Sequence, residues 1–177
     1  QHHHAHIAAV MAEHSRRDRV LGLAFDGTGA GTDGTVWGGE LLLCGLGGYA
    51  RAGSLAPWRL PGAAASVRDA RRNALSLLYA ADLLDHPGAA AALGKLDPTV
   101  REVTLQMVER GINSPLTSSM GRLLDAASAL LGICGTATYE GEPAILLEAA
   151  AWRAYDRNAP AIDLPSFALS CQSPAEP

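Results

Sequence analysis

The chain has 177 residues, of which 48% are hydrophobic and 18% are charged, and its formal net charge is −4. A chain of this length buries roughly 70% of its unfolded surface, so we expect one domain with its own core. No stretch approaches the roughly 20 continuous apolar residues that cross a bilayer, and the arginines form no basic stripe with aromatic residues. The composition therefore argues against a membrane protein and against direct nucleic-acid binding.

The start of the chain and its cysteines indicate the compartment. Histidines stand where a secretory signal would have a basic and then an apolar segment. The three cysteines, Cys44, Cys134 and Cys171, are an odd number and lie far apart. This favours buried thiols in a reducing compartment over a disulfide framework. We therefore expect a cytoplasmic protein.

The first half of the chain predicts a helix followed by a small sheet. Residues 7–14 have a helix-forming composition, and the apolar run 20–25 is expected to be a buried strand. Strands around 37–43 and 49–55 are expected after the glycine-rich stretch 26–39, in a hairpin or meander. The prolines that follow are expected to end the sheet.

The second half predicts helices. Amphipathic patterns place them at residues 66–84, 100–110, 119–131 and 143–155. Ser66 is the expected N-cap of the first helix, and Gly111 is expected to end the second. The proline-containing segment 156–177 is interpreted as an irregular tail. The fold class is therefore α/β, with an N-terminal helix, a small sheet and a helical half.

Four histidines stand near the N-terminus, and two of them have the spacing of a metal-binding pair. His2 and His6 are four residues apart, so on a helix both imidazoles lie on one face and can bind one divalent ion. His3 and His4 are expected to point elsewhere, and a purification tag is the alternative origin of the cluster. Asp26, at the end of a strand, is the candidate third ligand. The alternative for Asp26 is that it caps its own backbone turn.

The glycine-rich stretch has the composition of a phosphate-binding turn. Residues 26–35 mix glycines with hydroxyl residues between two apolar strands, and such a turn lets backbone N–H groups approach phosphate oxygens. No Gly-Lys-Ser/Thr follows it, and no helix follows it, so it is neither a P-loop nor a dinucleotide fingerprint. A phosphate loop of the kind that actin-like ATPases use and an ordinary hairpin loop both fit the pattern.

Several motifs closely resemble the carbamoyltransferase region of the HypF family, which acts in hydrogenase maturation. They are QHHHAHIAA from Gln1, LAFDGTG from Leu23, GTDGTVWGGE from Gly31, INSPLTSSMGRLLD from Ile112 and TYEGE from Thr138. The resemblance covers roughly residues 1–150 and fades after Trp152. It implies a partial actin-like ATPase fold, related to that of TsaD proteins and antibiotic O-carbamoyltransferases, in a carbamoyltransferase domain over residues 1–155.

The resemblance implies a metal centre. His2 and His6 correspond to the His-x-x-x-His pair of the family, which binds iron or zinc. Asp26 corresponds to an aspartate that touches both the metal and the nucleotide, so the resemblance makes it a metal ligand and a catalytic residue. The relatives add a late aspartate from a Gly-Gly and Asp-Gly-Gly region, and no match to that region follows Glu148.

The resemblance also implies a nucleotide site. Gly27 and Thr28 correspond to the phosphate-binding segment. The segment from Gly121 resembles the nucleotide-contacting helix of TsaD, which makes Asp125 the adenosine-binding aspartate. Gly141 corresponds approximately to a glycine that meets the nucleotide. The alternative for Asp125 is a solvent-exposed residue on a surface helix.

The activity implied by the resemblance is carbamoyl transfer. Carbamoyl phosphate and ATP, with Mg²⁺, give carbamoyl-adenylate, whose carbamoyl group passes to the C-terminal cysteine of HypE. One alternative is a threonylcarbamoyl or O-carbamoyl transferase relative, although TsaD proteins have Ser-Gly-Gly where this chain has residues 25–28. Another is a catalytically incomplete fragment that only binds metal or a partner. The acylphosphatase, zinc-finger and adenylate-forming domains of the family, and the C-terminal end of the lobe, are expected to lie outside these residues.

Overall fold

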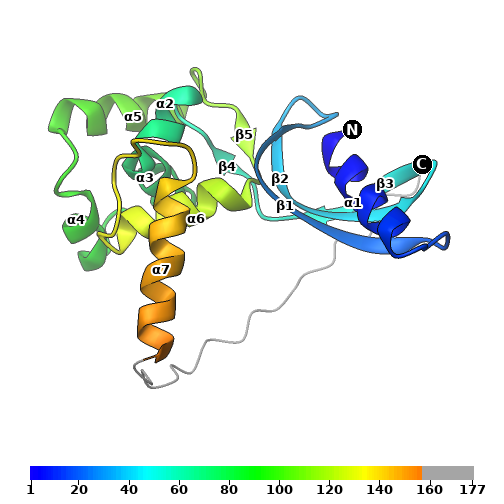
Figure 1. Cartoon of the computed structure of the whole chain (residues 1–177). Helices are drawn as coiled ribbons and strands as arrows, with labels where there is room; N and C mark the ends of the chain where they lie inside the picture. The colour runs from blue at the N-terminus through cyan, green and yellow to red at the C-terminus, as the bar shows by residue number, and fades with distance from the viewer. Residues whose placement is uncertain (157–177) are drawn as a thin grey trace.

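The structure is a computed structural model, and it describes residues 1–156. Figure 1 shows a sheet with one helix on its face, joined to a helical half. The strands are β1 (Val20–Ala30), β2 (Val36–Gly45), β3 (Gly48–Ser54), β4 (Trp58–Arg59) and β5 (Leu116–Thr117). The helices are α1 (His2–Glu13), α2 (Ala64–Arg68), α3 (Ala70–Ala80), α4 (Pro87–Leu93), α5 (Pro98–Arg110), α6 (Met120–Leu130) and α7 (Glu142–Asp156). The predicted α/β class is confirmed.

Two sequence predictions concern residues at or beyond the end of the described part. The predicted irregular tail lies outside the described residues except for Asp156, which ends α7. Cys171 also lies outside them, whereas Cys44 and Cys134 are buried free thiols. Burial raises the pKa of both thiols. Within residues 1–156, none of the helices is long and apolar enough to span a bilayer.

The sheet is built around β2. One edge of β2 pairs antiparallel with β1, and the other pairs antiparallel with β3 and, at Val36, parallel with Thr117 of β5. The short strand β4 pairs with β5 and completes the order β1-β2-β5-β4. The prediction that the sheet ends before the prolines was therefore wrong. Strands of two residues have no periodicity of their own and form only where the fold brings distant segments into register.

The glycine-rich stretch is mostly strand. β1 continues to Ala30, so the turn between β1 and β2 covers only residues 31–35. Phe25 pairs with Gly39 and Gly29 pairs with Trp37, which leaves residues 26–28 opposite a single residue of β2. This irregularity is a β-bulge, a feature that often lies next to functional sites. The expected ten-residue turn is therefore a bulge followed by a short turn.

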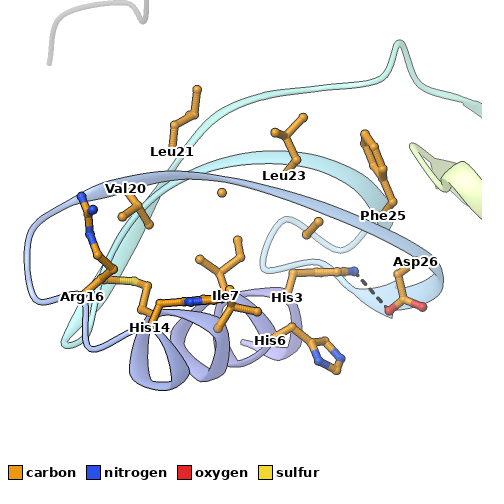
Figure 2. A pocket seen from close by; sticks show the side chains of 14 residues that line it. His3, His6, Ile7, His14, Arg16, Val20, Leu21, Leu23, Phe25 and Asp26 are labelled. Carbon is orange, nitrogen blue, oxygen red and sulfur yellow. Dashed lines mark ion pairs between the residues drawn. The ribbon is translucent and has the colours of Figure 1, made fainter.

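The predicted burial of β1 is wrong for one of its faces. Leu21, Leu23 and Phe25 are 57%, 61% and 58% exposed, and Figure 2 shows them pointing away from α1. α1 packs Ile7 and Met11 against the opposite face. Successive side chains of a strand point to opposite faces, so one covering helix buries only alternate residues.

The first predicted helix is interrupted. Asp69 has an extended backbone and pairs with Thr136 in an isolated bridge, which separates α2 from α3. The Asp69 carboxylate accepts a hydrogen bond from the Arg71 N–H and caps α3. Ser66 lies inside α2 and donates to the Pro61 carbonyl, so its predicted capping role was wrong. The break depends on a contact with a segment more than sixty residues away, which periodicity does not record.

The later helices follow the sequence prediction more closely. α5 begins after Asp97, whose carboxylate accepts from the N–H groups of Thr99 and Val100, and it ends at Gly111 with a φ of 67°. α6 and α7 have the predicted positions to within two residues. The short helix α4, which His86 caps, was not predicted. The Gly111 cap is a local feature, so the sequence alone predicts it.

Two hydrophobic clusters form the core. One lies between α1 and the sheet and contains Ile7, Met11, Ala24, Trp37, Leu42 and Cys44. The other lies among the helices and contains Ala70, Ala74, Leu75, Leu93, Leu96, Ala126 and Ala129. α6 contributes to the second cluster and also contacts β1, so it connects the sheet to the helical half.

The contact between α6 and β1 is a backbone approach that glycines permit. A Cβ placed on Gly121 would lie 2.7 Å from the Cα of Gly27. A Cβ placed on Gly38 would lie 2.6 Å from the Asp26 carbonyl oxygen. Ser119 caps α6 by accepting from the Arg122 N–H at 3.0 Å, and its hydroxyl donates to the Gly27 carbonyl.

A buried glutamate stabilises the same region. Glu40 is fully buried in β2, and its carboxylate accepts from the Gly38 N–H at 3.2 Å, from the Ser118 hydroxyl and from Arg51 Nε at 2.7 Å. The Arg51 guanidinium lies 4.3 Å from the centre of the Trp37 ring. The sequence analysis did not single out Glu40, although a glutamate directly before the apolar run 41–43 was an available signal.

We predict that Gly121→Ala lowers the free energy of unfolding by about 1–3 kcal/mol, because the added methyl group must push α6 away from the backbone of β1. Gly53→Ala in β3 is the matched control, since a Cβ there meets no atom within 4 Å. Urea unfolding followed by circular dichroism measures both. Equal unfolding midpoints for the two variants would show that the approach is not tight.

Candidate metal and nucleotide site

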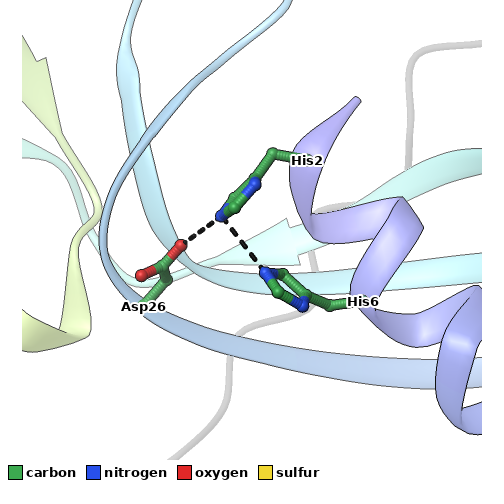
Figure 3. A group of neighbouring side chains, drawn as sticks. All are labelled: His2, His6 and Asp26. Carbon is green, nitrogen blue, oxygen red and sulfur yellow. Dashed lines mark hydrogen bonds and ion pairs between the residues drawn. The ribbon is translucent and has the colours of Figure 1, made fainter.

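Three side chains that the sequence analysis selected converge in the structure. His2 and His6 lie on one face of α1, and Asp26 follows the regularly paired part of β1 (Figure 3). His2 Nε2 lies 2.8 Å from Asp26 Oδ2 and 3.3 Å from His6 Nε2. One ligand atom from each residue lies within 4.8 Å of the other two. The structure thus brings the predicted metal ligands together, and ion binding by them stays a prediction.

The two oxygens of the Asp26 carboxylate face different partners, the Gly27 N–H and His2. Partial burial acts to raise the pKa of Asp26, but hydrogen bonds from the Gly27 N–H and from His2 outweigh it and lower this pKa. Oδ1 accepts from the Gly27 N–H at 2.6 Å, and Oδ2 faces His2. The local capping role and the ligand role, posed as alternatives in the sequence, therefore use different oxygens.

The donor set fits zinc or ferrous iron. Imidazole nitrogens suit both ions, and two histidines with one carboxylate is a recurrent set for each. The His2 side chain is 52% exposed and that of Asp26 is 31% exposed, so the cluster is open to solvent on one side. It also lies at one end of a cavity of ≈ 600 Å³ between α1 and β1, to which His6 and Asp26 contribute (Figure 2). An ion held here would have positions left for a substrate atom.

The two remaining histidines of the motif behave differently. His4 points away, with Nε2 2.9 Å from the Gly45 carbonyl oxygen. His3 is fully buried, and its Nε2 lies 3.5 Å from Asp26 Oδ2. Burial lowers the pKa of His3, although the charge of Asp26 acts to raise it. The expectation that both point elsewhere was therefore wrong for His3.

The predicted phosphate-binding residues lie in the β1 bulge. Gly27 contacts the start of α6 through Gly121 and Ser119. Thr28 lies in the unpaired part of β1, next to Gly29. The guanidinium of Arg122 comes within 3.8 Å of a Cβ placed on Gly27. Arg122 was not among the predicted site residues, and nothing in its local sequence distinguishes it from a surface arginine.

Asp125 is buried, so the surface-helix alternative was wrong. It is 1% exposed, and its Oδ2 lies 3.1 Å from Arg122 Nη1. Burial raises the pKa of Asp125, and the charge of Arg122 only partly counteracts this. Gly141 has a φ of 82° and directly precedes α7, which packs against α6. Asp125 and Gly141 therefore belong to the helical half, whereas the three candidate metal ligands belong to α1 and β1.

The sequence matches one family of enzymes. A family model described as the second subdomain of the Kae1-like domain of carbamoyltransferases matches residues 22–173. The chain belongs to the HypF carbamoyltransferase family. It is 44% identical over 151 residues to a carbamoyltransferase HypF homolog of Cupriavidus necator. It is 40% identical over 165 residues to the carbamoyltransferase HypF of a Synechocystis species.

Solved HypF structures resemble the chain in fold as well. Full-length HypF in a phosphate- and nucleotide-bound form superposes with a TM-score of 0.78 at 40% identity, and covers 84% of this chain. HypF of T. kodakarensis superposes with a TM-score of 0.71 at 37% identity, and covers 86% of it. These matches confirm the predicted family and fold class.

The HypF relatives are much longer than the matched region. The alignments cover 85% and 84% of this chain but only 38% and 21% of the two curated relatives. The two solved chains are covered to 23% and 21%. The family model extends to residue 173, beyond the point at which the resemblance was expected to fade.

We predict that Asp125→Ala lowers the free energy of unfolding by about 3–5 kcal/mol, because it leaves the buried guanidinium of Arg122 without a counter-charge. The double variant Arg122→Met, Asp125→Leu should recover most of this loss. Asp18→Ala is the control, since the Asp18–Arg16 pair is exposed and its removal should leave the unfolding midpoint unchanged. Urea unfolding measures all three. An Asp125→Ala variant as stable as the control would contradict the buried pair.

Proposed function

We propose that this chain supplies part of the carbamoyl-transfer site of a HypF-type enzyme. In the proposed reaction, carbamoyl phosphate and ATP, with Mg²⁺, provide carbamoyl-adenylate, and its carbamoyl group passes to the C-terminal cysteine of HypE. The observation that carries the proposal is the convergence of His2, His6 and Asp26 beside the β1 bulge. The similar proteins are named carbamoyltransferases, which supports the reaction class.

The transfer is a substitution at the carbamoyl carbon. The cysteine sulfur forms a bond to that carbon, the bond from the carbon to the adenylate phosphate oxygen breaks, and AMP leaves with the bonding electrons. The cysteine attacks as a thiolate, so its proton is lost to the surroundings before bond formation. Iron or zinc held by His2, His6 and Asp26 would supply a Lewis acid for the carbonyl oxygen. Asp26 would offer Oδ2 to this ion, while its Oδ1 accepts a hydrogen bond from the Gly27 N–H.

The residues proposed for the adenylate come from the β1 bulge and from the helical half. Gly27 and Thr28 would approach the phosphate, and Asp125 and Gly141 would contact the nucleoside. Among the described residues, both Asp125 oxygens lack hydrogen bonds, as do Nε and Nη1 of Arg122. Such unsatisfied buried groups are rare, and a ligand with hydroxyl donors and phosphate acceptors would satisfy them. A nucleotide reaches Asp125 only after the groups that cover it move apart. A similar HypF was solved with phosphate and nucleotide bound, which supports this part of the proposal.

A second candidate is a module that binds metal or HypE without completing the transfer. It needs only the clustered side chains of His2, His6 and Asp26. The two candidates share the metal site and differ in catalysis.

We predict that the purified chain binds one equivalent of Zn²⁺ or Fe²⁺. Removing a hydrogen-bonding partner of a metal ligand typically weakens affinity about 10–100-fold, so removing a ligand itself should weaken it more. His2→Ala, His6→Ala and Asp26→Ala should each do so. His14→Ala is the control, because His14 is an exposed histidine at the end of the same helix. Competition with a chromophoric chelator measures the affinities. Equal affinities in all four variants would exclude this site.

We predict that the metal-loaded chain carbamoylates a peptide carrying the HypE C-terminal cysteine when carbamoyl-adenylate is supplied. Mass spectrometry of the peptide detects the thiocarbamate. Asp26→Ala should abolish the product, and His14→Ala should retain it. Metal binding without any product would favour the binding module over the transferase.

A further inference from the structure

His3 is held between the candidate metal ligands and the sheet. It is fully buried, and its ring stacks on Trp37 with the ring centres 6.2 Å apart. The ring also covers Gly29, where any Cβ would collide with it. Figure 2 shows the side chain extending from α1 along β1 towards Asp26. Packing on two sides therefore fixes the direction in which both ring nitrogens point.

Gln1 determines which nitrogen of His3 carries the proton. The Gln1 Oε1 accepts from the His4 N–H at 3.0 Å, and its Nε2 donates to the Ala30 carbonyl at 3.3 Å. These two contacts fix the orientation of the amide. Its Nε2 therefore also donates to His3 Nδ1, which lies 2.9 Å away. A nitrogen that accepts carries no proton, so the proton of the neutral ring is on Nε2.

The His3 Nε2–H is directed at Asp26. Asp26 Oδ2 lies 3.5 Å away, and among the described residues this buried nitrogen makes no hydrogen bond. At present Oδ2 accepts from His2 Nε2 at 2.8 Å. A histidine that binds an ion through Nε2 uses its lone pair there and has no proton to donate. When His2 and His6 bind an ion in this way, His3 is the remaining α1 side chain that can donate a hydrogen bond to Asp26.

We propose that His3 is a positioning residue that donates Nε2–H to Asp26 Oδ2 and so orients the carboxylate towards an ion shared with His2 and His6. The inference rests on the metal site of the proposed function. Hydrogen bonds to ligating groups fix ligand orientation, and their loss typically weakens metal affinity about 10–100-fold. The Gln1–His3–Asp26 chain would connect the cap of α1 to the candidate metal centre.

Metal affinity of three variants tests the inference. His3→Leu fills the buried position with an apolar side chain and removes the donor, and should weaken Zn²⁺ binding about 10–100-fold. His3→Gln keeps an N–H donor at a similar reach and should restore most of the affinity. His4→Leu is the matched control, because His4 is the neighbouring histidine and contacts Gly45 instead of Asp26. The visible spectrum of bound Co²⁺ should change in His3→Leu and not in His4→Leu. A purely structural role would lower the stability of the metal-free chain without changing that spectrum.

Long-range ¹H–¹⁵N correlation spectra of the unaltered chain provide a second measurement that does not depend on the folding of a variant. A proton on His3 Nε2 is expected, and a proton on Nδ1 alone would overturn the inference. Unchanged Zn²⁺ affinity in a folded His3→Leu variant would overturn it as well, while leaving the metal site intact. Failure of the unaltered chain to bind Zn²⁺, Fe²⁺ or Co²⁺ would instead overturn the metal site and this inference with it.

Discussion

The close approach of the β1 bulge to the first turn of α6 is the constraint on which the rest of the structure depends. Gly121 approaches the Gly27 backbone so closely that no side chain fits on Gly121, and Ser119 donates to the bulge while it caps the helix. This contact joins the sheet core to the helical core, because α6 packs against both. Asp26 directly precedes the contact, so the position of the candidate metal ligand depends on how α6 is seated.

Buried polar groups surround this contact, and they give it a specific geometry. Glu40 accepts hydrogen bonds from β2, from β3 and from Ser118, the residue before the α6 cap. Arg122 and Asp125 place an ion pair one turn further along α6, with fewer hydrogen bonds than burial normally demands. Such groups contribute little net stability when paired, but they strongly disfavour arrangements that separate the partners. The bond between Glu40 and Ser118 therefore specifies how β2 meets the start of α6.

The candidate metal centre combines a regular element with an irregular one. α1 presents His2 and His6 by helical periodicity, and Asp26 stands where the pairing of β1 and β2 becomes irregular. The two Asp26 oxygens have different partners, since Oδ1 accepts from the backbone and Oδ2 faces the histidines. One residue can therefore both cap its own turn and offer a ligand atom. The same arrangement brings His3 close to Oδ2, which fits a role in orienting the carboxylate.

Local features were readable in the sequence. Periodicity placed α5, α6 and α7 and put His2 beside His6, and the capping chemistry of Gly111 marked the C-terminal end of α5. The long motifs determined the family. Tertiary structure alone decided the break at Asp69, the two short strands and the exposure of one face of β1, because each depends on segments far apart in the chain. It also decided that Asp125 and His3 are buried, since burial follows from which elements pack together and not from a residue's neighbours in sequence.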